Sequence, residues 1–252
     1  MKKYLQKKTE MQANLPPISE IWVYLSGSPL LALVLTLSAY LLGLTLYERS
    51  DRNPLANPVL IAVILVSLSI NLLDMPYVKY FEGAQFVHFL LGTATVSLAI
   101  PIYKGFASLK GRMGILMLAL LAGGVTSIFT AVGMARLLGV DESLVHGLVA
   151  KSVTAPIAMG IAERVQASPT LTAIFAVSTG ILGAVLGRYV LDALRITAWW
   201  QRGFALGIAA HGIGTSRAFS VNPEAGAYAS LGMGLHGILG AVLIPYAVAW
   251  WF

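Results

Sequence analysis

Long runs without a charged residue constrain this chain more than any other feature of its sequence. Asp, Glu, Lys and Arg are absent from residues 21–47, 53–73, 113–135, 165–187 and 225–252. A membrane-spanning helix needs about 20 mostly apolar residues. Only 11% of the 252 residues are charged, compared with about 25% in soluble domains. The sequence therefore predicts an all-α, polytopic helical membrane protein that lies in a lipid bilayer.

The charged residues and the absence of cysteine narrow the possible functions. The chain has no cysteine, which excludes disulfides, thiol catalysis and cysteine metal sites. Its net charge is +6, and Lys2, Lys3, Lys7 and Lys8 supply four of the positive charges. Such a cluster orients a membrane protein rather than binding nucleic acid. We expect residues 1–20 to be a cytoplasmic basic segment and residues 21–252 to form a single transmembrane domain.

Residues 141–165 place a lysine and a proline inside one apolar run. If a helix starts at Asp141, Lys151 lies roughly 15 Å in at 1.5 Å per residue, near the middle of a hydrocarbon core about 30 Å thick. Pro156 removes a backbone donor and disfavours helix at Ala155. Backbone freed at that depth is tolerated only beside protein or a wet cavity. The segment is therefore predicted to break beside the charge and to form a polar site.

An internal repeat predicts a second break. The sequence GILGAVL occurs at 180–186 and again at 237–243. The first copy is preceded by AKSVTAPIA and the second by AHGIGTSRA, so that Lys151 aligns with His211. A weaker first unit contains LGTATVSLAIP at 91–101. We predict repeated units, each a broken (re-entrant or discontinuous) helix followed by a Gly-rich spanning helix, at about 84–138, 141–194 and 203–250.

Charge placement favours broken segments that dip into the membrane and return. With a cytoplasmic N-terminus, two spanning helices bring the chain back to that side near Asp74. Dipping segments then place the basic loops 104–112 and 188–202 inside and Asp141 outside, as the positive-inside rule prefers. They also make successive units inverted copies. Full crossing by discontinuous helices is the alternative, and cysteine labelling at positions 108 and 142 distinguishes the two.

Candidate substrate-binding residues gather at the first predicted break. Lys151 offers a charge to an anionic substrate, or else snorkels or pairs with a carboxylate such as Glu163. Ser152 and Thr154 either donate to a carboxylate or bond back to the helix and pack between helices. These three residues are the candidates in this segment.

The second predicted break offers a histidine, glycines, two hydroxyls and an arginine. Glycines let a backbone approach a ligand, and a following helix N-terminus favours an anion. His211 either binds substrate or bonds a neighbouring helix. Arg217 either grips a carboxylate or is an ordinary interfacial arginine. The candidates in this segment are His211, Gly212, Gly214, Thr215, Ser216 and Arg217.

The remaining polar residues are predicted to be structural. His88, His146 and His236 have no convergent carboxylates and no metal-binding spacing. Thr93, Thr95 and Ser97 carry no charge, which favours helix packing. Because no nucleophile–base constellation or metal set is present, an enzyme is the least favoured class, and we expect no metal or cofactor.

Three motifs carry a resemblance to a known family. The chain resembles the LrgB/CidB family of bacterial membrane proteins at KSVTAPIAM (151–159), GILGAVLG (180–187) and AHGIGTSRA (210–218). Asn57-Pro58 also fits the family's Asn-Pro near the second helix, and it adds Asn57 to the candidate substrate-binding residues. Because proline suits the first turn of a helix, we also expect this spanning helix to begin near Pro58, with Asn57 as its cap. The resemblance runs from about residue 21 to the C-terminus. It implies a multi-pass protein of the bacterial inner (cytoplasmic) membrane, and we also expect a homo-oligomer such as a dimer.

The resemblance implies two different functions. The family is named for a holin/antiholin-like role in controlling murein hydrolase activity and autolysis, with a small LrgA/CidA-type membrane partner. Related proteins are linked to transport of small carboxylates, namely pyruvate in bacteria and glycolate and glycerate in plant plastids. Two broken segments in repeated positions are the usual frame of a midplane substrate site. We therefore expect a transporter or channel for small monocarboxylate anions, with the lysis regulator as the alternative.

Overall fold

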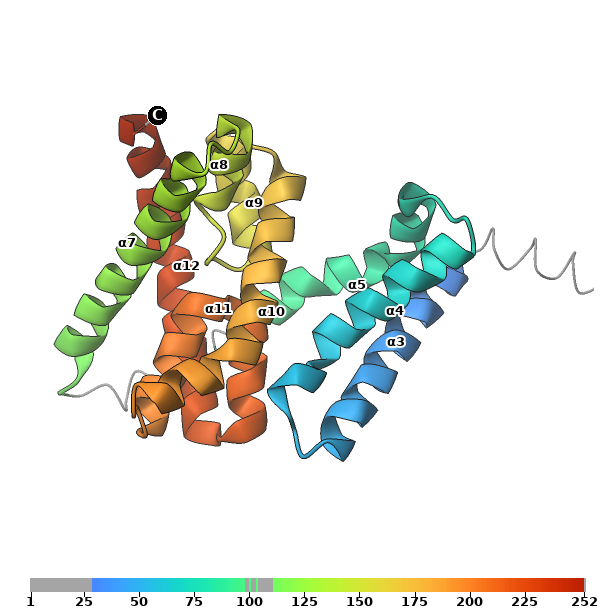
Figure 1. Cartoon of the computed structure of the whole chain (residues 1–252), viewed down its shortest axis with the longest axis horizontal. Helices are drawn as coiled ribbons and strands as arrows, with labels where there is room; N and C mark the ends of the chain where they lie inside the picture. Colours follow the sequence, from blue (N-terminus) through green and yellow to red (C-terminus); the bar gives the residue numbers. More distant parts are fainter. Residues whose placement is uncertain (1–28, 98–99, 101–102, 104–110, 252) are drawn as a thin grey trace, which may run out of the picture.

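The structure, a computed structural model, describes residues 29–97, 100, 103 and 111–251. These residues form helices joined by short loops, without a strand (Figure 1). Within this described part, four stretches are long and apolar enough to cross a membrane, namely Leu30–Arg49, Met113–Leu137, Pro169–Ala193 and Pro223–Ala249. The predicted all-helical class is therefore confirmed. The elements are α3 (Pro29–Arg49), η1 (Pro54–Ala56), α4 (Pro58–Leu72), α5 (Tyr77–Ser97), α7 (Met113–Leu137), α8 (Glu142–Leu148), α9 (Ala155–Arg164), α10 (Pro169–Ala193), α11 (Trp199–Val221) and α12 (Pro223–Trp251).

The start of α4 follows directly from two residues of the sequence. Asn57 Oδ1 accepts hydrogen bonds from the backbone N–H groups of Val59 and Leu60, at 2.9 and 3.1 Å. Pro58 occupies the first helical position, where its missing N–H is not needed. The prediction that α4 begins at Pro58 with Asn57 as its cap is therefore confirmed.

Two further helices begin with the same chemistry. Ser168 Oγ accepts the N–H of Leu171 ahead of α10, and the residue after the cap is again a proline. Asp141 caps α8 by accepting hydrogen bonds from the backbone and side chain of Ser143. These bonds favour the charged carboxylate, so they lower the pKa of Asp141 below its usual value.

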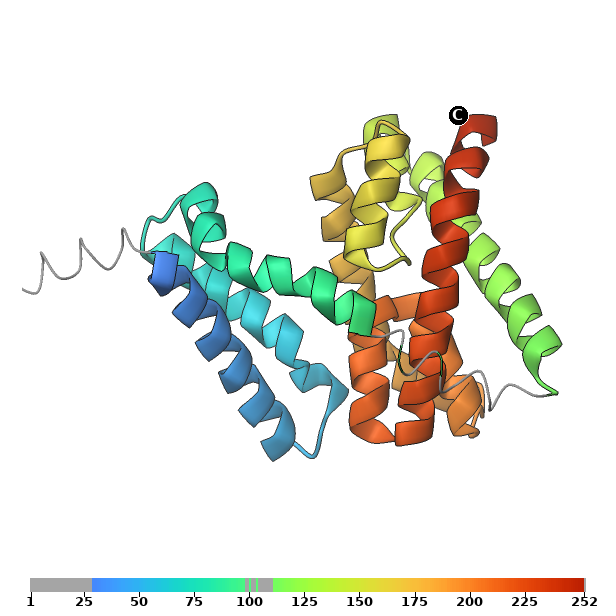
Figure 2. The same cartoon turned by 180° about the vertical axis from the view of Figure 1, so that it is seen from behind.

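Helices α3, α4 and α5 form a first group, seen to one side of the molecule in Figures 1 and 2. α3 packs along α4 and α5, and a hydrogen bond of 2.8 Å joins Thr36 Oγ1 on α3 to Tyr80 OH on α5. α5 is helical without interruption from Tyr77 to Ser97. Residues 92–97, expected in the broken segment of the first unit, are therefore helical, whereas most of residues 98–110 lie outside the described part.

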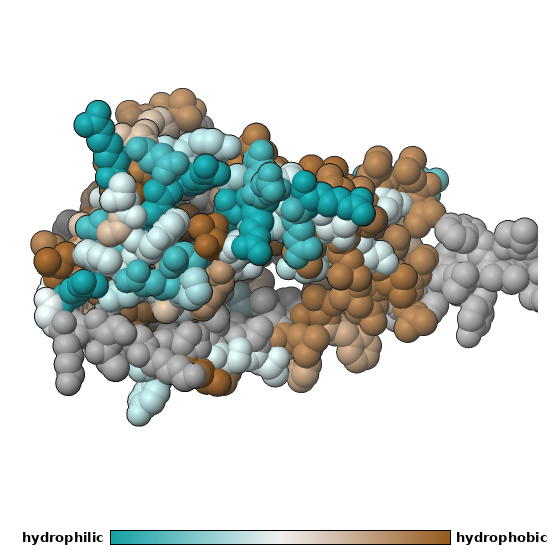
Figure 3. All heavy atoms as spheres, turned by 90° about the horizontal axis from the view of Figure 1, so that it is seen from below, coloured by the Kyte–Doolittle hydropathy of each residue, from teal (hydrophilic) through white to brown (hydrophobic). Residues whose placement is uncertain are grey.

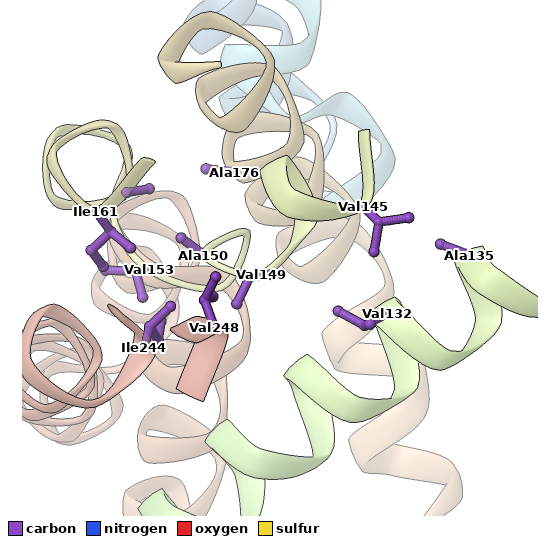
Figure 4. Packing of buried hydrophobic residues seen from close by; sticks show 11 residues of the cluster. Val132, Ala135, Val145, Val149, Ala150, Val153, Ile161, Ala176, Ile244 and Val248 are labelled. Atoms are coloured by element: carbon purple, nitrogen blue, oxygen red, sulfur yellow. The ribbon is translucent and has the colours of Figure 1, made fainter. Parts of the chain in front are cut away.

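Helices α7 to α12 form a second group with its main apolar core beneath α8 and α9. Figure 4 shows core side chains from α7, α10, α12 and the α8–α9 region gathered together. Val145, Val149 and Val153 are at most 2% exposed. This packing holds the turn between α8 and α9 against three longer helices. The buried members are Val132, Ala135, Val145, Val149, Ala150, Val153, Ala158, Ile161, Ala176, Ile244 and Val248.

Small residues bring α11 and α12 into close contact. A methyl group on Gly203 would collide with the backbone of Ala225, and one on Gly207 with the backbone of Ala229. The two glycines are four residues apart on α11, and the two alanines are four residues apart on α12. This is the small-xxx-small pattern that allows helix backbones to approach closely in membranes. Since the two contacts share one offset, the first part of α11 runs parallel to the start of α12.

The loops at one end of the molecule, the lower end in Figure 1, carry several arginines that bond across them. Asp192 pairs with Arg202 at 2.7 Å and with Arg188 at 3.6 Å. Arg52 donates to the backbone carbonyl of Ser220 at 2.6 Å. Figure 3 looks onto this end and shows hydrophilic residues gathered on it. The loop after α3 therefore lies at the same end as the loops around α11.

Candidate functional site

The chain is not helical between α8 and α9. α8 ends at Leu148 and α9 begins at Ala155, with Pro156 in its first turn. In Figures 1 and 2 the turn between these two short helices lies below both of them, on the side that faces α11. Proline lacks an N–H to bond back into α8 and constrains the residue before it, so the helix restarts there.

α11 contains a second interruption, at His211. This residue has φ 40° and ψ −129°, far from helical values. A methyl group on Gly214 would lie 2.6 Å from the carbonyl oxygen of Leu206. Eight residues of unbroken helix would separate these positions by about 12 Å. The chain therefore turns back at His211, and the two parts of α11 pack against each other.

Contacts from α10 hold this turn. His211 is 4% exposed, and its Nε2 donates a hydrogen bond of 2.8 Å to the carbonyl oxygen of Ala176. The imidazole lies directly against Gly180, where a methyl group would come within 2.6 Å of Cε1. A positive φ is uncommon outside glycine, so the hydrogen bond and the close fit offset an unfavourable backbone conformation.

The repeated GILGAVL sequences lie against the two interruptions in a crossed arrangement. On α10, Gly180 and Gly183 face His211 and the residue before it on α11. On α12, a methyl group added to Gly237 or to Gly240 would lie 2.9 Å from a side chain in α9 or in the turn between α8 and α9. Thus α10 packs against the interruption in α11, whereas α12 packs against the turn between α8 and α9 and against α9 itself.

Lys151 lies in the turn between α8 and α9 and is partly buried. Its Nζ donates a hydrogen bond of 3.1 Å to Ser127 Oγ on α7. Ser127 is ten residues from the end of α7 at Leu137, or about 15 Å along the helix. Within the described chain, the ion pairs found do not include Lys151. The ammonium is therefore held near the middle of a spanning helix by a hydroxyl rather than by a carboxylate.

A cavity of about 1050 Å³ opens beside this ammonium. Its described walls come from α7, α10 and the first part of α11, and Lys151 is the charged residue among them. Most of the wall is aliphatic or aromatic. The polar side chains that line it are Thr126, Ser127, Lys151, Thr179, Trp200 and Gln201. The site therefore combines one cation and a few hydroxyls with a large apolar cavity that is open on one side.

Ser152, the residue after Lys151, is buried in the protein and does not line the cavity. It is 1% exposed, and a hydrogen bond of 3.0 Å joins its Oγ to Nε2 of His236 on α12. His236 is 5% exposed and packs against Gly124 on α7. The pair fixes the residue next to Lys151 to two other helices, which positions the lysine.

The other residues predicted at the interruptions do not line the cavity. Thr154 precedes α9 at its cap position without a capping hydrogen bond. Thr215 is 3% exposed and donates to Met233 Sδ at 3.8 Å, and Gly212 lies near the same sulfur. Gly214 packs inside the α11 turn, as described above, whereas Ser216 is exposed.

Arg217 and Asn57 lie in structural positions outside the cavity. Arg217 Nη1 donates to the hydroxyl of Tyr47 and, at 2.8 Å, to the carbonyl oxygen of Arg52. Its guanidinium also lies 5.3 Å from the centre of the Tyr47 ring. The carboxamide of Asn57 is engaged in capping α4. Arg217 therefore connects α11 to the first group of helices, and no described contact places either residue beside Lys151.

We expect Arg217→Gln to destabilise the protein by about 2 kcal/mol, because hydrogen bonds from a charged donor are worth about 1.5–3 kcal/mol each. Thermal unfolding of the purified protein in detergent measures the effect. Arg188→Gln is the matched control, since its exposed pair with Asp192 contributes about 0–1 kcal/mol. Equal effects of the two substitutions would contradict the role assigned to Arg217.

Sequence reasoning missed one residue of this site, Ser127, and did not identify the partner of His236. Ser127 was not singled out, although the hydroxyl pair at 126–127 interrupts an apolar span. His236 was assigned a structural role, and the structure pairs it with Ser152. A usable signal was present, because His236 directly precedes the second GILGAVL, as Thr179 precedes the first, and Thr179 lines the cavity. No cluster of three potential metal ligands occurs among residues 29–97 and 111–251.

Comparisons with known proteins agree on one family. The profile of the LrgB-like family matches residues 36–250. YwbG of Bacillus subtilis is 34% identical over 220 residues, which is 87% of this chain and 97% of that protein. The Holin-like protein CidB of Staphylococcus epidermidis is 28% identical over 218 residues, covering 86% of this chain and 95% of the relative. YxaC of Bacillus subtilis is 32% identical over 223 residues, or 88% and 96% of the two chains. No solved structure matches significantly.

Proposed function

The chain belongs to the LrgB-like family, and from this premise we propose that it is a membrane transporter or channel for small monocarboxylate anions. One observation carries the proposal. The Lys151 ammonium lines a large cavity near mid-membrane, and its described partner is the hydroxyl of Ser127. Pyruvate, glycolate and glycerate each carry one negative charge, which would pair with the Lys151 ammonium.

The energetics of the bilayer support an anion at Lys151. A lysine at the centre of a spanning segment costs about 2.5–3.5 kcal/mol on insertion scales and marks a functional position by default. The neighbouring hydroxyls, Thr126, Ser127 and Thr179, supply donors for carboxylate oxygens. A charge-assisted hydrogen bond is roughly twice as strong as a neutral one. The site is therefore suited to bind a carboxylate and to release it when water enters.

We further propose that the two interruptions belong to inverted repeats of a broken segment followed by a glycine-rich spanning helix. The crossed packing of the two GILGAVL copies supports this, because each copy faces the interruption of the other unit. Inverted repeats that meet at the bilayer midplane are the usual frame of secondary transporters. In this arrangement Lys151 and His211 occupy equivalent positions, and Lys151 is the residue whose charge binds the substrate anion.

Cysteine labelling of the natural cysteine-free chain tests this topology. We expect Glu142→Cys and Thr197→Cys, both exposed, to be labelled from opposite sides of the membrane, with position 197 cytoplasmic. The excess of arginine at the end that holds position 197 favours this orientation. Labelling of both positions from the same side would contradict dipping segments.

The orientation bears on the N-terminal segment as well. Residues 1–20, expected to be cytoplasmic, lie outside the described part, and so does position 108. α3 carries the chain from Pro29 to Arg49, at the end that also holds the loops around α11. A cytoplasmic segment before α3 therefore requires position 197 to be external. The label at position 197 decides between these two expectations.

A second function is favoured by the names of the relatives. CidB of Staphylococcus epidermidis is called a holin-like protein, so a role in controlling murein hydrolase activity, with a small LrgA/CidA-type membrane partner, is the competing proposal. Uptake of labelled pyruvate and glycolate into proteoliposomes that hold only this chain separates the two. We expect uptake above empty liposomes. No uptake, combined with altered lysis of cells that express the chain, would favour the regulator.

A further inference from the structure

The cavity beside Lys151 is much longer than a small carboxylate needs. Its described wall on α7 runs from Ile115 to Ser127, or about 18 Å of helix at 1.5 Å per residue. Its volume of about 1050 Å³ would hold roughly 35 water molecules at about 30 Å³ each. A small acid bound at Lys151 would therefore fill only the end that carries the ammonium.

Polar groups lie at the two ends of the cavity and apolar groups between them. Ser127 belongs to the Lys151 end, near the middle of α7, and Thr179 lies at a similar depth on α10. Trp200 and Gln201, at the start of α11, belong to the opposite end. An aliphatic chain fits such a wall, since apolar surface gains by leaving water. The residues between the ends include Ala119, Ala122, Leu182, Leu186, Val190 and Phe204.

We propose that the site also takes aliphatic monocarboxylates, held with the carboxylate on Lys151 and the hydrocarbon tail along the cavity toward Trp200. This inference rests on the proposed function, because it uses the same lysine. Charge complementarity sets the direction of the ligand, since the described lining holds a single charged residue.

At the far end of the cavity, the described arginine already has aromatic partners. Arg112, which begins α7 at that end, places its guanidinium 4.8 Å from the centre of the Trp200 ring. The same side chain donates to the hydroxyl of Tyr228 at 3.4 Å. Its charge is therefore engaged with aromatic rings, a contact that is favourable in itself. A ligand with one carboxylate and one apolar end matches this cavity better than a dicarboxylate.

Calorimetric titration of the purified full-length chain in detergent, with acetate, butanoate, hexanoate and octanoate, tests the inference. Burial of a methylene group strengthens binding by about fourfold. We expect affinity to rise by about this factor per added methylene until the tail reaches the Trp200 end. Alkylamines of equal length should not bind, because Lys151 would repel them.

A matched pair of variants locates the tail. Ala119 lines the cavity eight residues before Ser127, about 12 Å along α7. We expect Ala119→Phe to weaken octanoate binding at least tenfold and to leave acetate binding unchanged. Leu118→Phe is the control, since Leu118 is 70% exposed and does not line the cavity. Lys151→Gln should weaken every acid in the series.

The outcomes separate this inference from the proposed function. Binding of acetate that requires Lys151, without a gain from longer tails, would overturn the inference and leave the proposed function in place. Absence of binding by any acid would overturn both. A phospholipid that stays bound to the purified chain and is not displaced by octanoate would assign the cavity to lipid and overturn the inference alone.

Discussion

Lys151→Gln is expected to reduce carboxylate binding and uptake by roughly 10- to 100-fold, because a hydrogen bond to a charged group is worth about 1.5–3 kcal/mol. Glutamine keeps much of the side-chain length and an N–H donor for Ser127, so the change removes mainly the charge. The concentration dependence of pyruvate uptake into proteoliposomes measures the effect.

The same substitution is expected to leave thermal stability unchanged or raised. The ammonium has a hydroxyl as its described partner, and a lysine at such depth costs about 2.5–3.5 kcal/mol. Loss of uptake with retained stability separates a binding role from a structural one. Lys79→Gln, on the exposed surface of α5, is the matched control and should change neither quantity. Normal uptake by the Lys151 variant would refute the proposed site.

Gly207→Ala is expected to destabilise the protein by about 1–3 kcal/mol or more, the usual cost of overpacking. The added methyl group would collide with the backbone oxygen of Ala229 on α12. A backbone atom cannot move aside by changing rotamer, so α11 and α12 would have to separate. Thermal unfolding of the purified protein, followed by circular dichroism, measures the loss.

Gly133→Ala gives this experiment its control. A methyl group on Gly133, inside α7, meets no atom within 4 Å. Alanine is favoured over glycine in a helix interior by about 0.5–1 kcal/mol. The two glycine-to-alanine changes should therefore shift the unfolding temperature in opposite directions. A gain in stability from both would show that α11 and α12 are not packed as described.

The helices and several of their ends could be predicted because the signals are local. Uncharged runs predicted the spanning helices, and Asn57-Pro58 predicted the start of α4. Residues 92–97 were expected in a broken segment and are helical in α5, so hydroxyl residues alone were a weak sign of a break. Proline acts on the backbone itself, which is why Pro156 was the stronger signal.

The partners of the site residues could not be predicted, because they lie far away in the sequence. Lys151 meets Ser127 across 24 residues, and Ser152 meets His236 across 84. Arg217 was grouped with His211 because they are close in sequence, but its described hydrogen bonds reach Tyr47 and Arg52, at a separation of 165 residues or more. A repeat can indicate which residues are equivalent, but only packing decides which residues touch.

The bond between Ser152 and His236 has a consequence for biosynthesis. Chains grow from the N-terminus, so the lysine-bearing turn is made well before the helix that fastens it. Until α12 is added, neither His236 nor Gly240 is present to hold this turn. The turn that carries Lys151 is therefore fastened last, and a stop codon ahead of α12 would leave this turn without its contacts to His236 and Gly240.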